Sequence, residues 1–134
     1  MKNLYNAEIH ELPRLAKDVE IFCAQNSLGR DLEFALNLVL EEIFANVCLH
    51  GYEKPGGKVE IEISKSPKKI TLKISDSAKE FNPLEQAPKP DLNAKIEDRE
   101  IGGLGVHIIK TIMDEASYER AGGKNILTLS KNTD

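Results

Sequence analysis

The chain has 134 residues, of which 40% are hydrophobic and 30% charged, and its formal net charge is −4. This length and composition predict one globular domain, residues 1–134, with a buried core, and the charge gives no reason for direct binding to nucleic acid or to an anionic membrane. No apolar run approaches the ~20 residues needed to cross a bilayer, and residues 1–6 lack the apolar core of a signal peptide, so we expect a cytoplasmic protein.

The first half of the chain predicts a short strand followed by two helices. Weak alternation over residues 4–9 suggests an edge strand, and apolar residues at helical spacing predict a helix over Glu11–Gln25. A longer helix is predicted to begin at Asp31 and to run to Gly51, where the glycine-rich residues 51–57 supply a stop and a loop.

This central helix has polar side chains where a buried helix needs none. Glu42, Asn46 and His50 follow one another at four-residue spacing, which places them along one face of the helix. Because apolar residues flank this face, we expect it to point into a ligand pocket rather than into water. A second polar row falls on a separate face, which can be solvated, and consists of Glu33, Asn37 and Glu41.

The next segment predicts a β-hairpin and then a long loop. Alternation over residues 58–63 and 70–75 predicts two antiparallel strands with one buried face. The same alternation places Asp76 on the inward face, where a carboxylate needs a partner. Residues 77–101 are rich in proline and have no sustained period, so we expect a lid or a disordered segment there.

The last part of the chain predicts a helix and a closing hairpin. Gly102–Gly105 precede an apolar helix of about three turns, and two alternating segments surround Gly122 and Gly123. The complete order of elements predicts an α+β fold. We expect a two-layer sandwich in which about three helices cover one face of a mixed, mostly antiparallel sheet.

Three groups of residues along the chain are suited to chemistry. The Gly102–Gly105 turn offers backbone N–H groups at a helix N-terminus, which bind phosphate, although a plain glycine turn fits equally well. Asp76 is able to accept a hydrogen bond from an exocyclic amine such as that of adenine, or to serve only as a turn carboxylate. Glu42 and Asn46 provide a carboxylate base and a hard oxygen ligand for Mg²⁺ one helical turn apart, where the alternative is a surface glutamate and a structural asparagine.

Taken together, these motifs resemble a known superfamily. Residues 42–52 contain Glu-x-x-x-Asn and end in His-Gly-Tyr, which resembles the N-box helix of the GHKL (Bergerat-fold) ATPases and kinases. Residues 76–83 resemble the first glycine box, residues 102–109 the second, and residues 118–129 the end of the domain. The chain resembles a single histidine-kinase-like ATPase domain, and within the superfamily it is most similar to the bacterial anti-sigma-factor serine/threonine-protein kinases.

The resemblance implies a role for each matching position. Asn46 would coordinate the Mg²⁺ that bridges the phosphates of ATP, Glu42 would be the general base for an incoming serine hydroxyl, and Asp76 would recognise the adenine amino group. Positioning and charge neutralisation would then carry phosphoryl transfer. The other nucleotide-binding positions implied by the motifs are Ala78, Phe81, Gly102, Gly103, Leu104, Gly105 and Val106.

The resemblance also implies partners. Members of this family phosphorylate a small protein, the anti-sigma-factor antagonist, and sequester a sigma factor in a nucleotide-dependent way, commonly as dimers. We therefore expect an ATP- and Mg²⁺-dependent protein serine/threonine kinase.

Two other functions fit the same motifs. One is a non-catalytic ATP-binding partner-switch module of the same fold. The other, the catalytic domain of a histidine kinase, is disfavoured because His10 and His50 lie in the wrong contexts and no phosphoacceptor helix pair is recognisable in the sequence.

One position departs from the family pattern. Ala78 stands where the first glycine box has glycine. If the backbone there requires a positive φ, alanine is strained; if glycine serves only for a close approach, one methyl group is tolerated.

Overall fold

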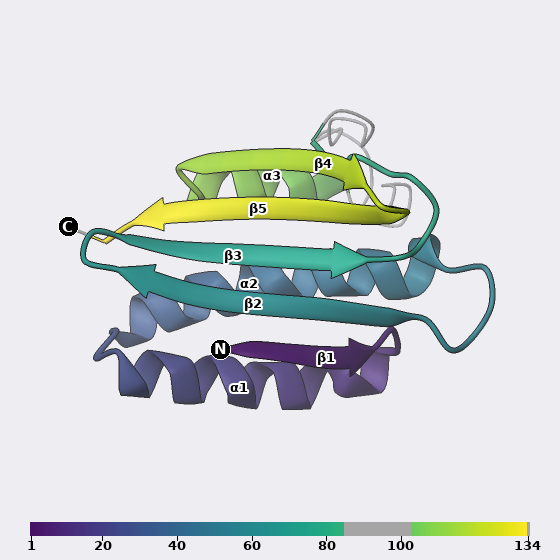
Figure 1. Ribbon diagram of the computed structural model, residues 1–134. Coiled ribbons are helices and arrows are strands. Elements are labelled where there is room, and N and C mark those ends of the chain that lie inside the picture. The colour runs from purple at the N-terminus through teal and green to yellow at the C-terminus, as the bar shows by residue number, and fades with distance from the viewer. Residues whose placement is uncertain (85–102, 134) are drawn as a thin grey trace.

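The computed structural model describes residues 1–84 and 103–133 of the protein, and the side chains of residues 103–106 also lie outside its description (Figure 1). Five strands form one sheet in the order β1-β2-β3-β5-β4. Each of the four pairings between neighbouring strands is antiparallel. The strands are β1 (Lys2–Asn6), β2 (Lys58–Ser66), β3 (Lys69–Asp76), β4 (Glu115–Ala121) and β5 (Lys124–Asn132).

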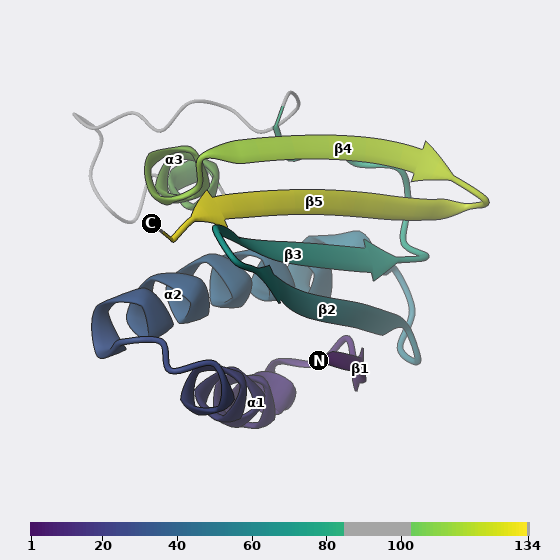
Figure 2. The ribbon, with the colours of Figure 1, turned by 60° about the vertical axis from the view of Figure 1, so that its left-hand side comes forward.

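The helices α1, α2 and α3 cover one face of this sheet, with α2 between the other two (Figure 2). The helical segments are η1 (Ile9–Glu11, a 3₁₀ turn), α1 (Leu12–Gln25), α2 (Arg30–Asn46), η2 (Val47–Gly51, a π-helical turn) and α3 (Gly103–Ile112). The predicted two-layer α+β sandwich is therefore confirmed, including the order of its elements, and its sheet is antiparallel throughout the described residues rather than mixed. No helix in the described residues is long and apolar enough to span a bilayer.

The core forms between the inward face of the sheet and the apolar stripe of α2. The inward side chains of β2 and β3 recur every second residue, so that Ile61 and Leu72, for example, are fully buried. The buried residues of α2 recur at helical spacing and form one stripe against the sheet, which follows from 3.6 residues per turn. That stripe consists of Leu36, Val39, Leu40, Ile43 and Phe44.

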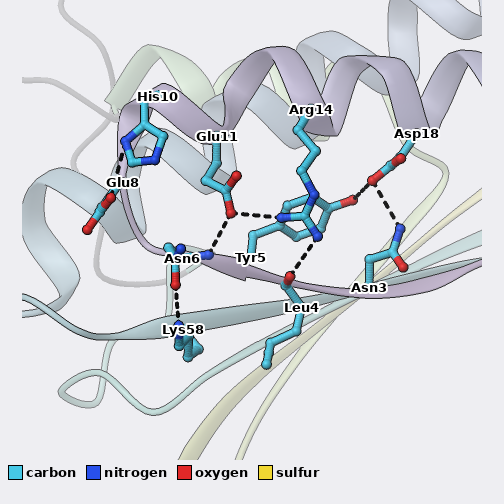
Figure 3. A network of polar contacts seen from close by, with 10 residues as sticks. All are labelled: Asn3, Leu4, Tyr5, Asn6, Glu8, His10, Glu11, Arg14, Asp18 and Lys58. Atoms are coloured by element: carbon cyan, nitrogen blue, oxygen red, sulfur yellow. Dashed lines mark hydrogen bonds and ion pairs between the residues drawn. The ribbon is translucent and has the colours of Figure 1, made fainter.

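The edge strand β1 is joined to α1 by side chains that bond its backbone (Figure 3). Glu11 accepts the N–H of Asn6 at 2.9 Å and Nη1 of Arg14 at 2.8 Å, while Nη2 of Arg14 donates to the Leu4 carbonyl at 3.0 Å. Since β1 pairs with only one strand, these bonds satisfy backbone groups that would otherwise need water.

Tyr5 anchors β1 to the helices. Its hydroxyl donates to Asp18 on α1 at 2.6 Å, and its ring packs edge-on against Phe44 of α2 with 6.1 Å between ring centroids. The guanidinium of Arg14 lies 4.4 Å from the centre of the same ring, a cation–π contact. Burial and the hydrogen bond to Asp18 raise the pKa of Tyr5 above its ordinary value.

Candidate functional site

The helix α2 places Glu42 and Asn46 one turn apart, as predicted, and both side chains are half-buried. The α-helical geometry ends at Asn46, and residues 47–51 form a wider π-helical turn. His50 is therefore not a third member of the same α-helical row, and it is exposed. A π-helical turn often marks a functional site, because it redirects the chain at the end of a regular helix.

The surroundings of Glu42 disfavour its ionised form. Partial burial, and then the nearby charge of Glu41, raise the pKa of Glu42 above its ordinary value. A carboxyl group with a raised pKa is a better proton acceptor once it is ionised, which suits a general base.

Asp76 ends β3 and points inward, as the alternation predicted, and it is 8% exposed. Its Oδ1 accepts two hydrogen bonds, from the Ala78 N–H at 3.0 Å and from Nδ2 of Asn125 at 2.9 Å. Within the described residues, no group bonds the other oxygen, Oδ2. A buried carboxylate is thus held by one oxygen and offers the second to a ligand that donates a hydrogen bond.

Asn125 holds Asp76 and the segment that follows it. It lies opposite Asp76 in the β3–β5 register and is 7% exposed. Besides Asp76, its Nδ2 donates to the Lys79 carbonyl at 2.9 Å, and its Oδ1 accepts the Phe81 N–H at 3.1 Å and the Tyr118 hydroxyl. All the hydrogen-bonding capacity of this amide is therefore used: three of its four bonds fix residues 76–81, and the fourth holds Tyr118 of β4.

No feature of the sequence marked Asn125 as part of the site, because the pairing register of β3 with β5 was not predictable. Arg120 on β4 was missed for the same reason, although its Nη1 donates to the Ala78 carbonyl at 2.8 Å. The signal in the sequence was Asp76 itself, because an inward carboxylate on one strand requires a donor such as an amide or a hydroxyl on a strand that pairs with it.

Ala78 is accommodated by a close contact with η2. Among the described residues, Ser27 is the single non-glycine residue with a positive φ, so Ala78 has an ordinary backbone conformation. Ala78 is 5% exposed, and a Cβ atom placed on Gly51 would lie 3.2 Å from the Ala78 Cβ and 3.3 Å from Cγ1 of Val47. Of the two reasons given for a glycine at this position of the first glycine box, close approach to a neighbouring segment therefore applies here, and backbone strain does not.

The remaining predicted site residues are placed in part. The backbone of Gly103, Leu104, Gly105 and Val106 forms the first turn of α3, which packs against α2. Gly102 lies outside the described residues, as does most of the predicted loop 77–101. Phe81 is described: its N–H bonds Asn125, while its ring is 40% exposed.

These groups gather at one end of the fold. The C-terminal ends of α2 and β3, the start of β5 and the start of α3 lie at the same end of the molecule, on the right in Figure 1. In the described residues, no three or more His, Cys, Asp or Glu side chains form a cluster suited to a metal ion. The single side-chain oxygen of Asn46 instead fits Mg²⁺, which keeps waters and takes substrate phosphates as ligands alongside one or two protein oxygens.

Comparison with known families gives one match over most of the chain. The family described as "Histidine kinase-like ATPase domain" matches residues 5–131. Among solved structures, the Acinetobacter baumannii histidine kinase AdeS covers 100% of this chain with a TM-score of 0.58, and this chain covers 68% of it. Its sequence is 17% identical, so this likeness concerns the fold alone.

Curated relatives are similar at lower coverage. The anti-sigma F factor of Thermoanaerobacter sp. (strain X514) is 32% identical over 92 residues, which are 69% of this chain and 64% of that protein. The serine/threonine-protein kinase BtrW of Bordetella bronchiseptica is 29% identical over 104 residues, 76% of this chain and 72% of the relative. The serine-protein kinase RsbW of Bacillus cereus is 24% identical over 95 residues, which are 69% of this chain and 59% of that protein. The match therefore spans less than two thirds of the anti-sigma F factor and of RsbW.

Proposed function

Because the chain belongs to the family of histidine kinase-like ATPase domains, we propose that it is an ATP-dependent protein serine/threonine kinase that regulates a sigma factor. The similar proteins named anti-sigma F factor, BtrW and RsbW support this choice within the family. We further propose that residues 1–134 act as one domain in the cytoplasm. One continuous sheet and one hydrophobic core in the described residues support the single domain.

The arrangement of Asp76 is the observation that carries the proposal. A buried carboxylate with one oxygen held by two N–H donors and the other without a partner in the described residues fits a ligand amine. The amino group of adenine supplies such a donor. Ala78 and Phe81 would line the same end of the nucleotide, and the buried methyl group of Ala78 already has room against Gly51.

The opposite end of the nucleotide would lie at α2 and α3. The first turn of α3, with Gly103, Leu104, Gly105 and Val106, would bind phosphate through backbone N–H groups that have no partner within the helix. We propose Gly102, which lies outside the described residues, as a further phosphate-binding position on its sequence motif alone. Asn46 would hold Mg²⁺, and a bound Mg²⁺ would neutralise charge on the phosphates. Glu42, whose pKa is raised by its surroundings, would accept the proton of an incoming serine hydroxyl.

The names of the relatives support a proposal for the protein partners. We propose that an anti-sigma-factor antagonist provides the serine or threonine hydroxyl, that a sigma factor is sequestered, and that the active form is a homodimer. None of the described helices covers the opposite face of the sheet, which supports placing such contacts there (Figure 2).

Two measurements test the proposal. Calorimetry with ATP and ADP, with and without Mg²⁺, should show binding; no binding at millimolar nucleotide would refute the nucleotide site. Incubation with radiolabelled ATP, Mg²⁺ and the antagonist proteins encoded by the same genome should label one antagonist, and Glu42→Ala should abolish the label. Partner binding that persists in Glu42→Ala without any labelling by the parent protein would instead favour the non-catalytic module.

A further inference from the structure

Tyr52 connects the end of the α2–η2 segment to the start of β2 and to the residue that follows β3. Its hydroxyl accepts the N–H of Ser77 at 2.8 Å and donates to the carbonyl of Lys58 at 2.6 Å. Ser77 directly follows Asp76, and Lys58 begins β2. One hydroxyl group therefore bridges the segment that follows Glu42 and Asn46 to the backbone next to Asp76.

The ring of Tyr52 lies on Gly57. A Cβ atom at Gly57 would lie 2.5 Å from three carbon atoms of this ring, closer than real contacts allow. Gly57 has no positive φ, in contrast to Gly56 with φ +99°, so the backbone at Gly57 is one that alanine adopts readily. The glycine at position 57 is therefore needed to seat the ring, and the glycine at position 56 is needed for the turn.

Without this hydroxyl, the hydrogen bonds that other described elements make to the backbone after Asp76 all come from one side. Asn125 and Arg120 bond the segment from β5 and β4, while on the α2 side the Gly51–Ala78 contact is purely van der Waals. Tyr52 supplies the hydrogen bond on the α2 side. Because hydrogen bonds are directional and dispersion contacts are not, this bond sets where the Asp76 segment lies relative to α2.

We propose that Tyr52 is a positioning residue for nucleotide recognition. Resting on the proposed function, the inference is that Tyr52 fixes the distance between the adenine-binding carboxylate of Asp76 and the phosphate-side groups on α2. Tyr52 itself need not contact the nucleotide. Ser77 and Lys58 are exposed, so water replaces the lost bonds in Tyr52→Phe and the variant still folds.

The test compares two nucleotides that differ by the amino group alone. ATP and purine riboside 5′-triphosphate, which lacks that amino group, are titrated with Mg²⁺ into the parent protein and into Tyr52→Phe. We expect ATP affinity to fall about tenfold in Tyr52→Phe, since small displacements of a binding group have large effects. The affinity for purine riboside triphosphate should hardly change, so the preference for ATP should largely disappear.

Gly57→Ala provides an independent route to the same effect, because it displaces the ring without removing the hydroxyl. Tyr52→Phe added to Gly57→Ala should cause no further loss of ATP preference. Gly29→Ala is the matched control: it has φ −75° and no atom within 4 Å of the added Cβ, so it should leave both affinities unchanged.

Three results would overturn the proposal or separate it from the function on which it rests. Unchanged ATP affinity in Tyr52→Phe would refute it, and an equal loss for both nucleotides would reduce Tyr52 to a structural role. If the parent protein binds neither nucleotide, the proposed function fails. Amide hydrogen exchange then still decides whether the Tyr52 hydroxyl holds Ser77, because the N–H of Ser77 should exchange faster in Tyr52→Phe than in the parent.

Discussion

Two carboxylates of the site are held in different ways. Asp76 is buried but receives two N–H donors on one oxygen, whereas Glu42 is half-buried beside another glutamate and receives no hydrogen bond from the described residues. The first arrangement favours a fixed hydrogen-bond acceptor. The second raises the pKa of Glu42 and makes its ionised form costly, as expected for a group kept for proton transfer.

Glu42→Gln should therefore stabilise the protein near neutral pH. Because the pKa of Glu42 is raised in the folded state, its contribution to stability is fully present below its ordinary pKa and is lost as pH rises through the raised value. Glutamine cannot ionise, so the gain over the parent should appear at pH 7 and vanish below about pH 4. Urea unfolding at both pH values measures it, with the exposed Glu53→Gln as control. A gain of equal size at both pH values would contradict the prediction.

Asn125→Asp should damage the site through Asp76. The change replaces the N–H donors to Asp76 and Lys79 by a second carboxylate beside the first. We expect a loss of about 2–4 kcal/mol in the free energy of unfolding and a strong loss of ATP binding. Tyr118→Phe removes a single bond to the same amide and should cost about 1 kcal/mol. Denaturant titration of both variants measures the difference, and equal losses would contradict the role given to Asn125.

Between elements, η2 comes close to the segment after β3 at Gly51 and Ala78. Gly51→Ala places a Cβ atom 3.2 Å from that of Ala78, and we expect a loss of about 1–3 kcal/mol from overpacking. Ala78→Gly in that background removes one of the two crowded atoms and should recover part of the loss. Unfolding of the two single variants and the double variant forms a thermodynamic cycle, and strictly additive losses would contradict the contact.

The junction of β1 with α1 depends on the shape of Arg14 (Figure 3). Its planar group bonds Glu11 and the Leu4 carbonyl while lying over the Tyr5 ring, and lysine cannot reproduce this geometry. Arg14→Lys should therefore cost about 1–2 kcal/mol in the free energy of unfolding.

Lys17 is the matched control for Arg14 on the same helix. Its exposed ion pair with Glu20 spans 3.6 Å, so Lys17→Ala should change the free energy of unfolding by less than about 0.5 kcal/mol. The same unfolding experiment measures both variants. A loss for Lys17→Ala as large as that for Arg14→Lys would mean that the fork geometry of Arg14 is unimportant.

The elements were predictable where local pattern decides them. Alternation in β3 placed Asp76 inward, and helical spacing placed Glu42 and Asn46 one turn apart, because both depend on the period of a single element. The π-helical turn at residues 47–51 was not predictable, since the same residues fit a continued α-helix.

At the scale of the whole molecule, topology brings distant segments together. The order β1-β2-β3-β5-β4 places β5 beside β3, so that Asn125 meets Asp76 across 49 positions of sequence. Register between two strands depends on the core packing of both and on turn geometry. The sequence motifs therefore indicated the α2 and β3 halves of the site, while the β4 and β5 contributions required the structure.

A ligand that binds across the end of this fold should stabilise the whole protein. A free ligand concentration of about 100 times Kd adds about 2.7 kcal/mol to the free energy of unfolding. For this chain length, that gain raises the midpoint of thermal unfolding by roughly 10 °C. We expect that shift with ATP and Mg²⁺ for the parent and for Glu42→Gln, because the role proposed for Glu42 is proton transfer and not nucleotide binding. Asp76→Asn should lose most of it, because its amide presents a donor in place of Oδ2 towards the adenine amine. Differential scanning calorimetry measures all three, and a full shift in Asp76→Asn would show that the nucleotide does not use this carboxylate.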